Sequence, residues 1–171
     1  LLLVSQTGAS PWSVLAQGIS LHVDYSIGTI TFFTSLFVIF LWIFLNQKPG
    51  IGTILNAIII AVMIDLCLKY IQTPEHIIAK FLLALFAVII VGVGSGFYLI
   101  ANLGPGPRDG LMTGLQNKTK LPIALVRAFL EITVVSVGWY LGGTVGFGTL
   151  MFAFGVGPAV ALGLYIVGKN F

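Results

Sequence analysis

Charged residues are scarce in this chain. Only 8% of its 171 residues are Asp, Glu, Lys or Arg, whereas a soluble domain carries about 25%. So few charges cannot cover a water-facing surface, which excludes a soluble globular protein. The mean hydropathy of +1.09 and the long apolar runs predict an integral membrane protein. Because these runs are continuous rather than alternating, they favour membrane helices over a β-barrel.

Residue types that carry catalysis and metal binding are equally scarce. Cys67 is the only cysteine, and its place inside an apolar run indicates a small core residue without a disulfide partner. His22 and His76 stand alone in expected loops. The net charge of +3 is too small and too scattered to indicate nucleic acid. We therefore expect no enzyme, no cofactor, no metal site and no nucleic-acid partner.

The apolar residues form five runs near the roughly 20 residues that a membrane helix needs. They cover residues 31–45, 51–71, 80–103, 121–141 and 147–167, and the short first run extends back to residue 27. The opening letters LLLVSQTGASP resemble the end of a further span whose start precedes residue 1. We therefore expect an all-α membrane protein with six spans in its complete form.

Two groups of residues recur 96 positions later in the chain. The matches are Gly8 with Gly104, Pro11 with Pro107, Leu15 with Leu111, Gly18 with Gly114, Gly50 with Gly146, Gly52 with Gly148, Thr53 with Thr149 and Ala57 with Ala153. One register without a gap indicates an internal duplication, with a truncated first repeat at 1–75 and a second at 76–171. Since each unit holds three spans, the two repeats have inverted topology. This arrangement is typical of secondary transporters and also occurs in channels.

The lysines and arginines predict the orientation, because cytoplasmic loops carry an excess of them. The basic residues expected inside are Lys48, Arg108, Lys118, Lys120 and Lys169. Lys69 and Lys80 flank a linker that is expected outside. This distribution predicts that both termini are cytoplasmic.

The stretch GPGPRDGLMTGL, residues 104–115, interrupts the apolar pattern. Pro107 suits the first position of a helix, where its missing N–H would be unpaired anyway, and Asp109 favours the positive end of the helix dipole. We predict short helices over 107–117 and, after the N-cap Ser10, over 11–20. Two interpretations stay open: an interfacial helix that joins two spans, or a re-entrant helix whose N-terminus faces a solute path. The second copy carries Arg108 and Asp109 where the first has the neutral Trp12 and Ser13.

Arg127 and Glu131 lie four residues apart and therefore on one face of the fourth span. A charge in hydrocarbon costs about 2.5–3.5 kcal/mol on insertion scales, so both are expected to face the protein interior. In one interpretation they form a structural pair that locks the span to its neighbours. In the other, Arg127 binds an anionic solute group or pairs with Asp109, and Glu131 titrates or binds a cation.

Other polar and small residues mark packing. Asn56 lies deep in the second span and can hydrogen-bond between helices, and Thr53 and Thr149 are predicted to cap the helices that follow two glycine turns. Asp65 and Lys69 have the spacing of a pair at the membrane edge. Small residues spaced for close helix packing are Gly92 with Gly96, Gly142 with Gly146, and Ala159 with Gly163.

The blocks GPGPRDGLMTGL, VRAFLEI, LGGTVGFGTL and GVGP together resemble the YczE/YyaS/YitT group of bacterial membrane proteins, as do GASPWSVLAQGIS and GIGTILNA in the first half. Members of that group are described as multi-pass membrane proteins and often as transporters. The resemblance covers nearly the whole chain and implies the bacterial cytoplasmic membrane, but it supplies no substrate. The residues in the matching motifs are Pro107, Arg108, Asp109, Arg127 and Glu131, and no assigned roles carry over to them.

Two functions compete. The first is a small secondary transporter of a polar or anionic solute, with Glu131 or Asp109 as the proton site. Its expected binding residues are Pro107, Arg108, Asp109, Arg127, Glu131, Asn56 and Thr149. The alternative is a non-transporting regulatory or assembly subunit that binds a protein or lipid, and it predicts a dry interior with Arg127 paired to Glu131. The expected partners are the lipid bilayer and a small-molecule solute, with a homo-oligomer as a further alternative.

Overall fold

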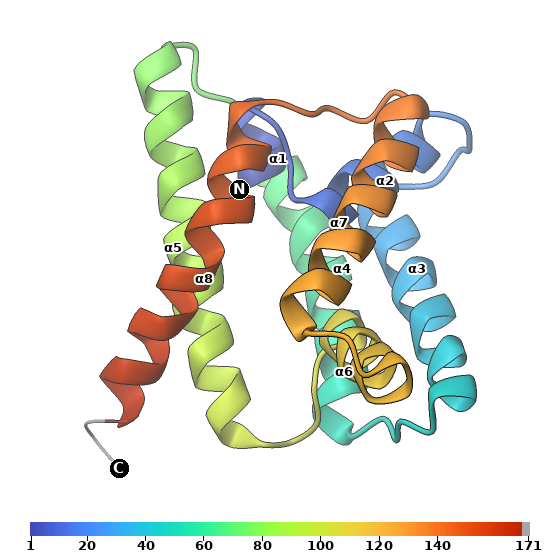
Figure 1. Ribbon diagram of the computed structural model, residues 1–171. Coiled ribbons are helices and arrows are strands. Elements are labelled where there is room, and N and C mark those ends of the chain that lie inside the picture. The colour runs from blue at the N-terminus through green and yellow to red at the C-terminus, as the bar shows by residue number, and fades with distance from the viewer. Residues whose placement is uncertain (169–171) are drawn as a thin grey trace.

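The computed structural model describes residues 1–168 as helices joined by short loops (Figure 1). Lys169, which is predicted to lie on the inner side, falls outside these residues. The elements in chain order are α1 (Leu2–Ser5), α2 (Pro11–Ser20), α3 (Ile27–Leu41), η1 (Trp42–Leu45), α4 (Ile51–Tyr70), α5 (Ile77–Ala101), α6 (Pro107–Thr119), α7 (Ile123–Tyr140) and α8 (Phe147–Gly168).

Five helical stretches within these residues are long and apolar enough to cross a membrane, namely α3 continued by η1, α4, α5, α7 and α8. They confirm the five predicted spans, and α5 begins three residues earlier than expected. Large apolar side chains such as Phe129 and Phe154 point outward and are mostly exposed. A surface of this kind is stable only in lipid, so the chain is a multi-pass membrane protein.

The two short helices lie toward opposite ends of the bundle, α2 toward the upper end and α6 toward the lower end in Figure 1. α2 has the predicted bounds, and α6 runs two residues further than predicted. Ser10 occupies the N-cap position of α2, but its hydroxyl is bonded to the Ser13 hydroxyl at 2.8 Å rather than to a backbone N–H. The predicted N-cap position of Ser10 is confirmed, without a capping hydrogen bond from its side chain.

Helix starts recur along the chain at one spacing. Pro11 and Pro107 begin α2 and α6, Ile27 and Ile123 begin α3 and α7, and Ile51 and Phe147 begin α4 and α8, each pair 96 residues apart. The backbone at the breaks recurs as well, because Gly8 and Gly104 have φ of 120° and 115°. These left-handed values are readily adopted only by glycine. In Figure 1, α3 and α7 run in opposite directions, and so do α4 and α8.

Two backbone hydrogen bonds tie the breaks to the rest of the bundle. The Gly52 N–H donates to the Leu103 carbonyl at 2.9 Å, and the Gly148 N–H donates to the Thr7 carbonyl at 2.8 Å. Each bond joins the segment before a short helix to the first turn of a spanning helix. The two bonds connect residues that are again 96 apart, so the same contact is made at both ends of the molecule.

The predicted capping threonines are confirmed. Thr53 accepts a hydrogen bond from the Gly50 N–H at 3.2 Å, and Thr149 accepts one from the Gly146 N–H at 3.3 Å. Thr53 also donates to the Pro105 carbonyl at 2.7 Å. Each threonine therefore satisfies a backbone group at the start of a span.

Small residues bring α5 and α8 together as predicted. A methyl carbon placed on Gly96 would lie 2.7 Å from the carbonyl carbon of Gly163, and one placed on Gly92 would collide with Ala159. The predicted helix-packing pair of Gly142 with Gly146 is wrong, because both residues lie in the loop between α7 and α8 rather than on a helix. Glycine spacing alone does not distinguish a helix face from a turn.

The predicted pair of Asp65 with Lys69 is also wrong. The Asp65 carboxylate accepts hydrogen bonds from the Ser26 hydroxyl at 2.6 Å and from the Gly28 N–H at 2.8 Å. Two donors at the N-terminus of α3 hold the carboxylate better than one flexible ammonium group at the membrane edge. Asp65 therefore fastens α4 to the start of α3.

The glycines of α5 make a matched test of this packing. Gly96→Ala forces the new methyl group against the α8 backbone and is expected to lower the free energy of unfolding by about 1–3 kcal/mol. Gly94→Ala is the control, because nothing lies within 4 Å of the added carbon. It is expected to leave stability unchanged or to raise it by up to about 1 kcal/mol. Thermal unfolding in detergent measures both, and equal melting temperatures would contradict the close contact.

Candidate functional site

Arg108 is a charged residue that contacts an aromatic ring instead of any carboxylate that the structure describes. It lies in the first turn of α6, and its guanidinium sits over the indole ring of Trp12, 5.1 Å from the ring centroid. Among the described residues no carboxylate comes within ion-pair distance of it. Although the side chain as a whole is only partly buried, desolvation lowers the pKa of the guanidinium to about 10, against the opposing effect of the Asp109 and Glu131 carboxylates. Arg108 therefore keeps its positive charge at neutral pH.

Asp109 is held by a tyrosine that sequence reasoning missed. The Tyr98 hydroxyl donates to the Asp109 carboxylate at 3.0 Å and accepts a hydrogen bond from the Gly106 N–H. Asn56 belongs to the same region, since a methyl carbon on Gly106 would lie 3.2 Å from an Asp109 oxygen and 3.5 Å from the Asn56 amide oxygen. The structure thus brings α4, α5 and α6 together around the start of α6. Tyr98 is the one side chain with a hydroxyl in the mostly apolar run FYLIANL, which was the available signal.

Pro107 contributes through its backbone. Its carbonyl accepts a hydrogen bond from the Trp42 indole N–H at 3.0 Å, and Trp42 is completely buried. The indole ring fills the space beside Gly110, where any side chain would collide with it. Trp42 therefore holds the first turn of α6 in place from the last turn of the first span.

Arg127 and Glu131 form an ion pair within α7, with 2.9 Å between Nε and Oε1. The Arg127 side chain is 41% exposed and the Glu131 side chain 17% exposed. The expectation that both charges face the interior therefore holds better for Glu131 than for Arg127. The other predicted partner of Arg127, Asp109, is bound to Tyr98 instead.

Thr149 lies apart from these residues. It caps α8 beside Gly8, where the loop before α2 meets the start of α8. Its match in the first half, Thr53, is the threonine that lies next to the loop before α6. The predicted site residues therefore fall into three groups: Asn56, Pro107, Arg108 and Asp109 around the start of α6, the Arg127–Glu131 pair on α7, and Thr149 alone.

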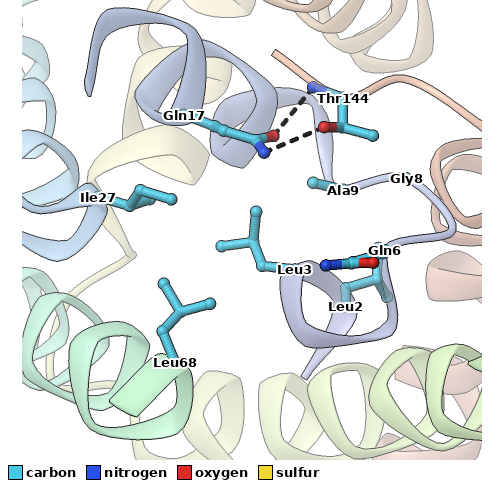
Figure 2. A pocket seen from close by; sticks show the side chains of 9 residues that line it. All are labelled: Leu2, Leu3, Gln6, Gly8, Ala9, Gln17, Ile27, Leu68 and Thr144. Atoms are coloured by element: carbon cyan, nitrogen blue, oxygen red, sulfur yellow. Dashed lines mark hydrogen bonds between the residues drawn. The ribbon is translucent and has the colours of Figure 1, made fainter. Parts of the chain in front are cut away.

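A cavity of about 450 Å³ lies elsewhere (Figure 2). Its lining residues are Leu2, Leu3, Gln6, Gly8, Ala9, Gln17, Ile27, Leu68 and Thr144. Gln17 and Thr144 close one side through two hydrogen bonds of 2.9 and 3.0 Å, drawn as dashed lines in Figure 2. None of the predicted site residues lines this cavity, so it is separate from the charged groups.

The membrane-length helices, their outward apolar side chains and the charged break at α6 define a multi-pass helical membrane protein with internal charge. The chain belongs to the DUF6198 family, a family of unknown function, which matches residues 1–164. Among its relatives, an uncharacterized protein of Haemophilus influenzae is 38% identical over 169 residues, which cover 99% of this chain and 78% of the relative.

Two relatives from Bacillus subtilis carry the names that the sequence motifs resemble. The uncharacterized membrane protein YczE is 31% identical over 85% of this chain and 68% of its own length. The uncharacterized protein YyaS is 23% identical over 88% of this chain and 77% of its own length. The resemblance to the YczE and YyaS group is therefore confirmed. No solved structure matches the chain.

A double-mutant cycle measures the Arg127–Glu131 pair. Because Arg127 is partly exposed, Arg127→Gln and Glu131→Gln are each expected to lower the free energy of unfolding by only about 1 kcal/mol. The double variant is expected to lose less free energy of unfolding than the two single variants together, because the second substitution removes a residue whose partner is already absent. Lys118→Gln is the control for loss of one cation, and strictly additive effects would show that the pair adds no stability.

Tyr98 makes a second prediction. Tyr98→Phe keeps the ring and leaves the Gly106 N–H and the Asp109 carboxylate without their partner, which is expected to cost about 1–3 kcal/mol of stability. Tyr140→Phe is the control, because Tyr140 is 90% exposed at the end of α7. Equal melting temperatures for the two variants would mean that the tyrosine hydroxyl does not organise the start of α6.

Proposed function

We propose that the protein is a small secondary transporter of the bacterial cytoplasmic membrane that carries a polar or anionic solute in a proton-coupled cycle. The observation that carries this proposal is Arg108 at the N-terminus of α6, a charged and desolvated side chain that forms no ion pair with a carboxylate among the described residues. Charge of this kind is costly in a membrane protein and marks solute pathways. The N-termini of interrupted helices bind anionic groups in transporters.

Inverted repeats are part of the proposal. Their support is the common spacing of 96 residues in the helix starts, the paired hydrogen bonds at the two breaks, and the opposite directions of α3 and α7 (Figure 1). We place the repeats at residues 1–75 and 76–171. In transporters with such repeats, the solute binds at the interface between the two halves, and movement of one half against the other opens the site to each side of the membrane in turn.

The proposed orientation follows from the basic residues. Lys48 precedes α4, and Lys118 and Lys120 lie at the end of α6, so all three belong to the end of the bundle that is lowest in Figure 1. Lys69 and Lys80 belong to the opposite end, where α4 finishes and α5 starts. An excess of lysine on one side favours the cytoplasm for that side.

Asp109 and Glu131 supply the proposed coupling. Both carboxylates lie close enough to Arg108 to act on its charge. A proton on either one makes the surroundings of Arg108 more positive and therefore strengthens the binding of an anion. By linkage the anion also strengthens the binding of the proton, so the two would move together.

A second candidate function also has an observation in its favour. The 2.9 Å pair of Arg127 with Glu131 supports it, because a non-transporting regulatory or assembly subunit predicts that these two residues are paired to each other. Such a subunit would bind a protein or lipid partner rather than a solute. No catalytic activity is proposed for either candidate.

The test is a ligand screen followed by uptake. Purified full-length protein in detergent is screened by thermal unfolding against small metabolites at several pH values, and compounds that stabilise it are then offered to proteoliposomes. Wild type is expected to take up at least one of them, and Arg127→Gln is expected to abolish uptake while the protein stays folded. Lys120→Gln, at the exposed end of α6, is the matched control. Uptake that is unchanged in Arg127→Gln removes Arg127 from the site. The absence of both ligands and uptake, together with a co-purifying partner, would favour the regulatory subunit.

A further inference from the structure

We propose that Trp12 and Arg108, which contact each other from the first turns of α2 and α6, form an anion-binding subsite, and that its ligand is a small soluble carboxylate or other oxyanion. The subsite deepens the proposed transporter, because its ligand would be the anionic group of the solute. Equilibrium binding tests it without any assumption about transport.

Trp12 and Arg108 occupy the same position in the two halves. They are 96 residues apart, each is the second residue of its short helix, and they touch each other. In a molecule made of two halves related by a twofold axis, a residue can contact its own counterpart only near that axis. The contact therefore places the starts of both short helices at the centre of the arrangement.

The hydrophobic cluster around Trp12 shows the same relation. Its members include Leu15 with Leu111 and Val38 with Val134, which are again pairs spaced 96 residues apart. The axis thus passes through this cluster, with the guanidinium of Arg108 against one face of the Trp12 ring. A position on such an axis in inverted repeats is where transporters hold their solutes.

Both helix N-termini are free to act on an anion. Neither α2 nor α6 has a side-chain capping hydrogen bond, and both begin with proline. The first backbone N–H groups of a helix have no acceptor within the helix. Each N-terminus also carries about half a positive charge from the helix dipole. Both helix dipoles therefore favour negative charge beside the first turns that carry Trp12 and Arg108.

The indole N–H of Trp12 is the independent observation that indicates a ligand. Trp12 is 6% exposed, and its buried Nε1 finds no acceptor in the part of the chain that the structure describes. The comparable tryptophan, Trp42, donates its indole N–H to the Pro107 carbonyl. A buried donor without an acceptor is rare and costly. An anion oxygen beside the ring would accept from it while the guanidinium above the ring neutralises the charge.

The balance of charges around Arg108 favours the binding of one anion. Arg108 and Arg127 are balanced by Asp109 and Glu131, but Glu131 is engaged by Arg127 and Asp109 by Tyr98. Arg108 therefore has two carboxylates nearby and an ion pair with neither. The dipoles of two helices add further positive potential, and a single bound anion would offset it.

A soluble anion fits this place better than a lipid headgroup. Trp12 belongs to a cluster whose members come from α2, α3, η1, α6 and α7, so the ring lies between helices rather than on the lipid-facing surface. A phospholipid would have to insert its phosphate among these helices while its acyl chains stayed outside. Both sources offer an oxyanion, and the experiment separates them.

The experiment measures anion binding to the full-length protein in detergent. Sodium acetate and sodium phosphate are titrated at constant ionic strength against sodium chloride, and the readouts are the melting temperature and the intrinsic tryptophan fluorescence. A parallel titration uses phosphatidylglycerol in mixed micelles. The variants are Trp12→Phe, which removes the N–H and keeps an aromatic face, Arg108→Gln and Arg108→Lys. Trp139→Phe is the matched control, because Trp139 is exposed near the end of α7.

Acetate or phosphate is expected to stabilise wild type and Trp139→Phe equally. Trp12→Phe is expected to bind about tenfold more weakly, as the loss of one hydrogen bond to a charged group predicts. Arg108→Lys is expected to bind more weakly than wild type and more tightly than Arg108→Gln, because it keeps the charge and loses the planar fork.

Equal affinity in all the variants, no effect of either anion on wild type, or stabilisation by phosphatidylglycerol alone would each overturn the subsite. Anion binding without uptake would support the subsite and overturn the transporter. Uptake that is insensitive to Trp12→Phe and to Arg108→Gln would support the transporter and overturn the subsite.

Discussion

The fold depends on one constraint, which is that backbone N–H and C=O groups inside hydrocarbon need partners. A break between two helices leaves such groups without partners inside a helix. Here the two breaks exchange hydrogen bonds with the first turns of two spans, through the carbonyls of Thr7 and Leu103. Because these bonds hold the segments before α2 and α6, they also determine where Trp12 and Arg108 lie. The backbone at the breaks is thus held by hydrogen bonds to two spans.

The charged residues divide by how their charge is satisfied. Arg127 has its partner one helical turn away, so its charge is paired within α7, although a partly exposed pair adds little stability. Arg108 has an aromatic face and two carboxylates at a distance, which offset its charge without binding it. A cation without an ion-pair partner costs stability. The start of α6 therefore combines a frame held by Trp42 with a cation that has no ion pair among the described residues.

The spans and the short helices could be predicted from the sequence, because hydropathy, proline and glycine act locally. Thr53 and Thr149 were predictable for the same reason, since each caps a turn three residues before it. The partners of Asp65, Asp109 and Arg108 were not, because they come from other helices. Sequence spacing predicted Lys69 as the partner of Asp65, whereas in the structure Asp65 accepts hydrogen bonds from Ser26 and Gly28. Tyr98 was missed since a tyrosine in an apolar run shows its role only when its neighbours are known.

At one contact, the two halves place residues of different size at positions 96 residues apart. Trp42 packs against Gly110 in one half, and the equivalent contact in the other half joins Gly138 to Val14. In one half the larger residue, Trp42, lies at the end of a span, and in the other half the larger residue, Val14, lies on a short helix. Neither half could therefore replace the other without a clash or a void. In the proposed transporter, the states open to the two sides of the membrane would therefore differ in energy even without solute. A difference of about 1.4 kcal/mol already favours one state tenfold. The proposed transporter would then rest mainly open to one side, and the sizes of Trp42 and Val14 opposite two glycines would select which side.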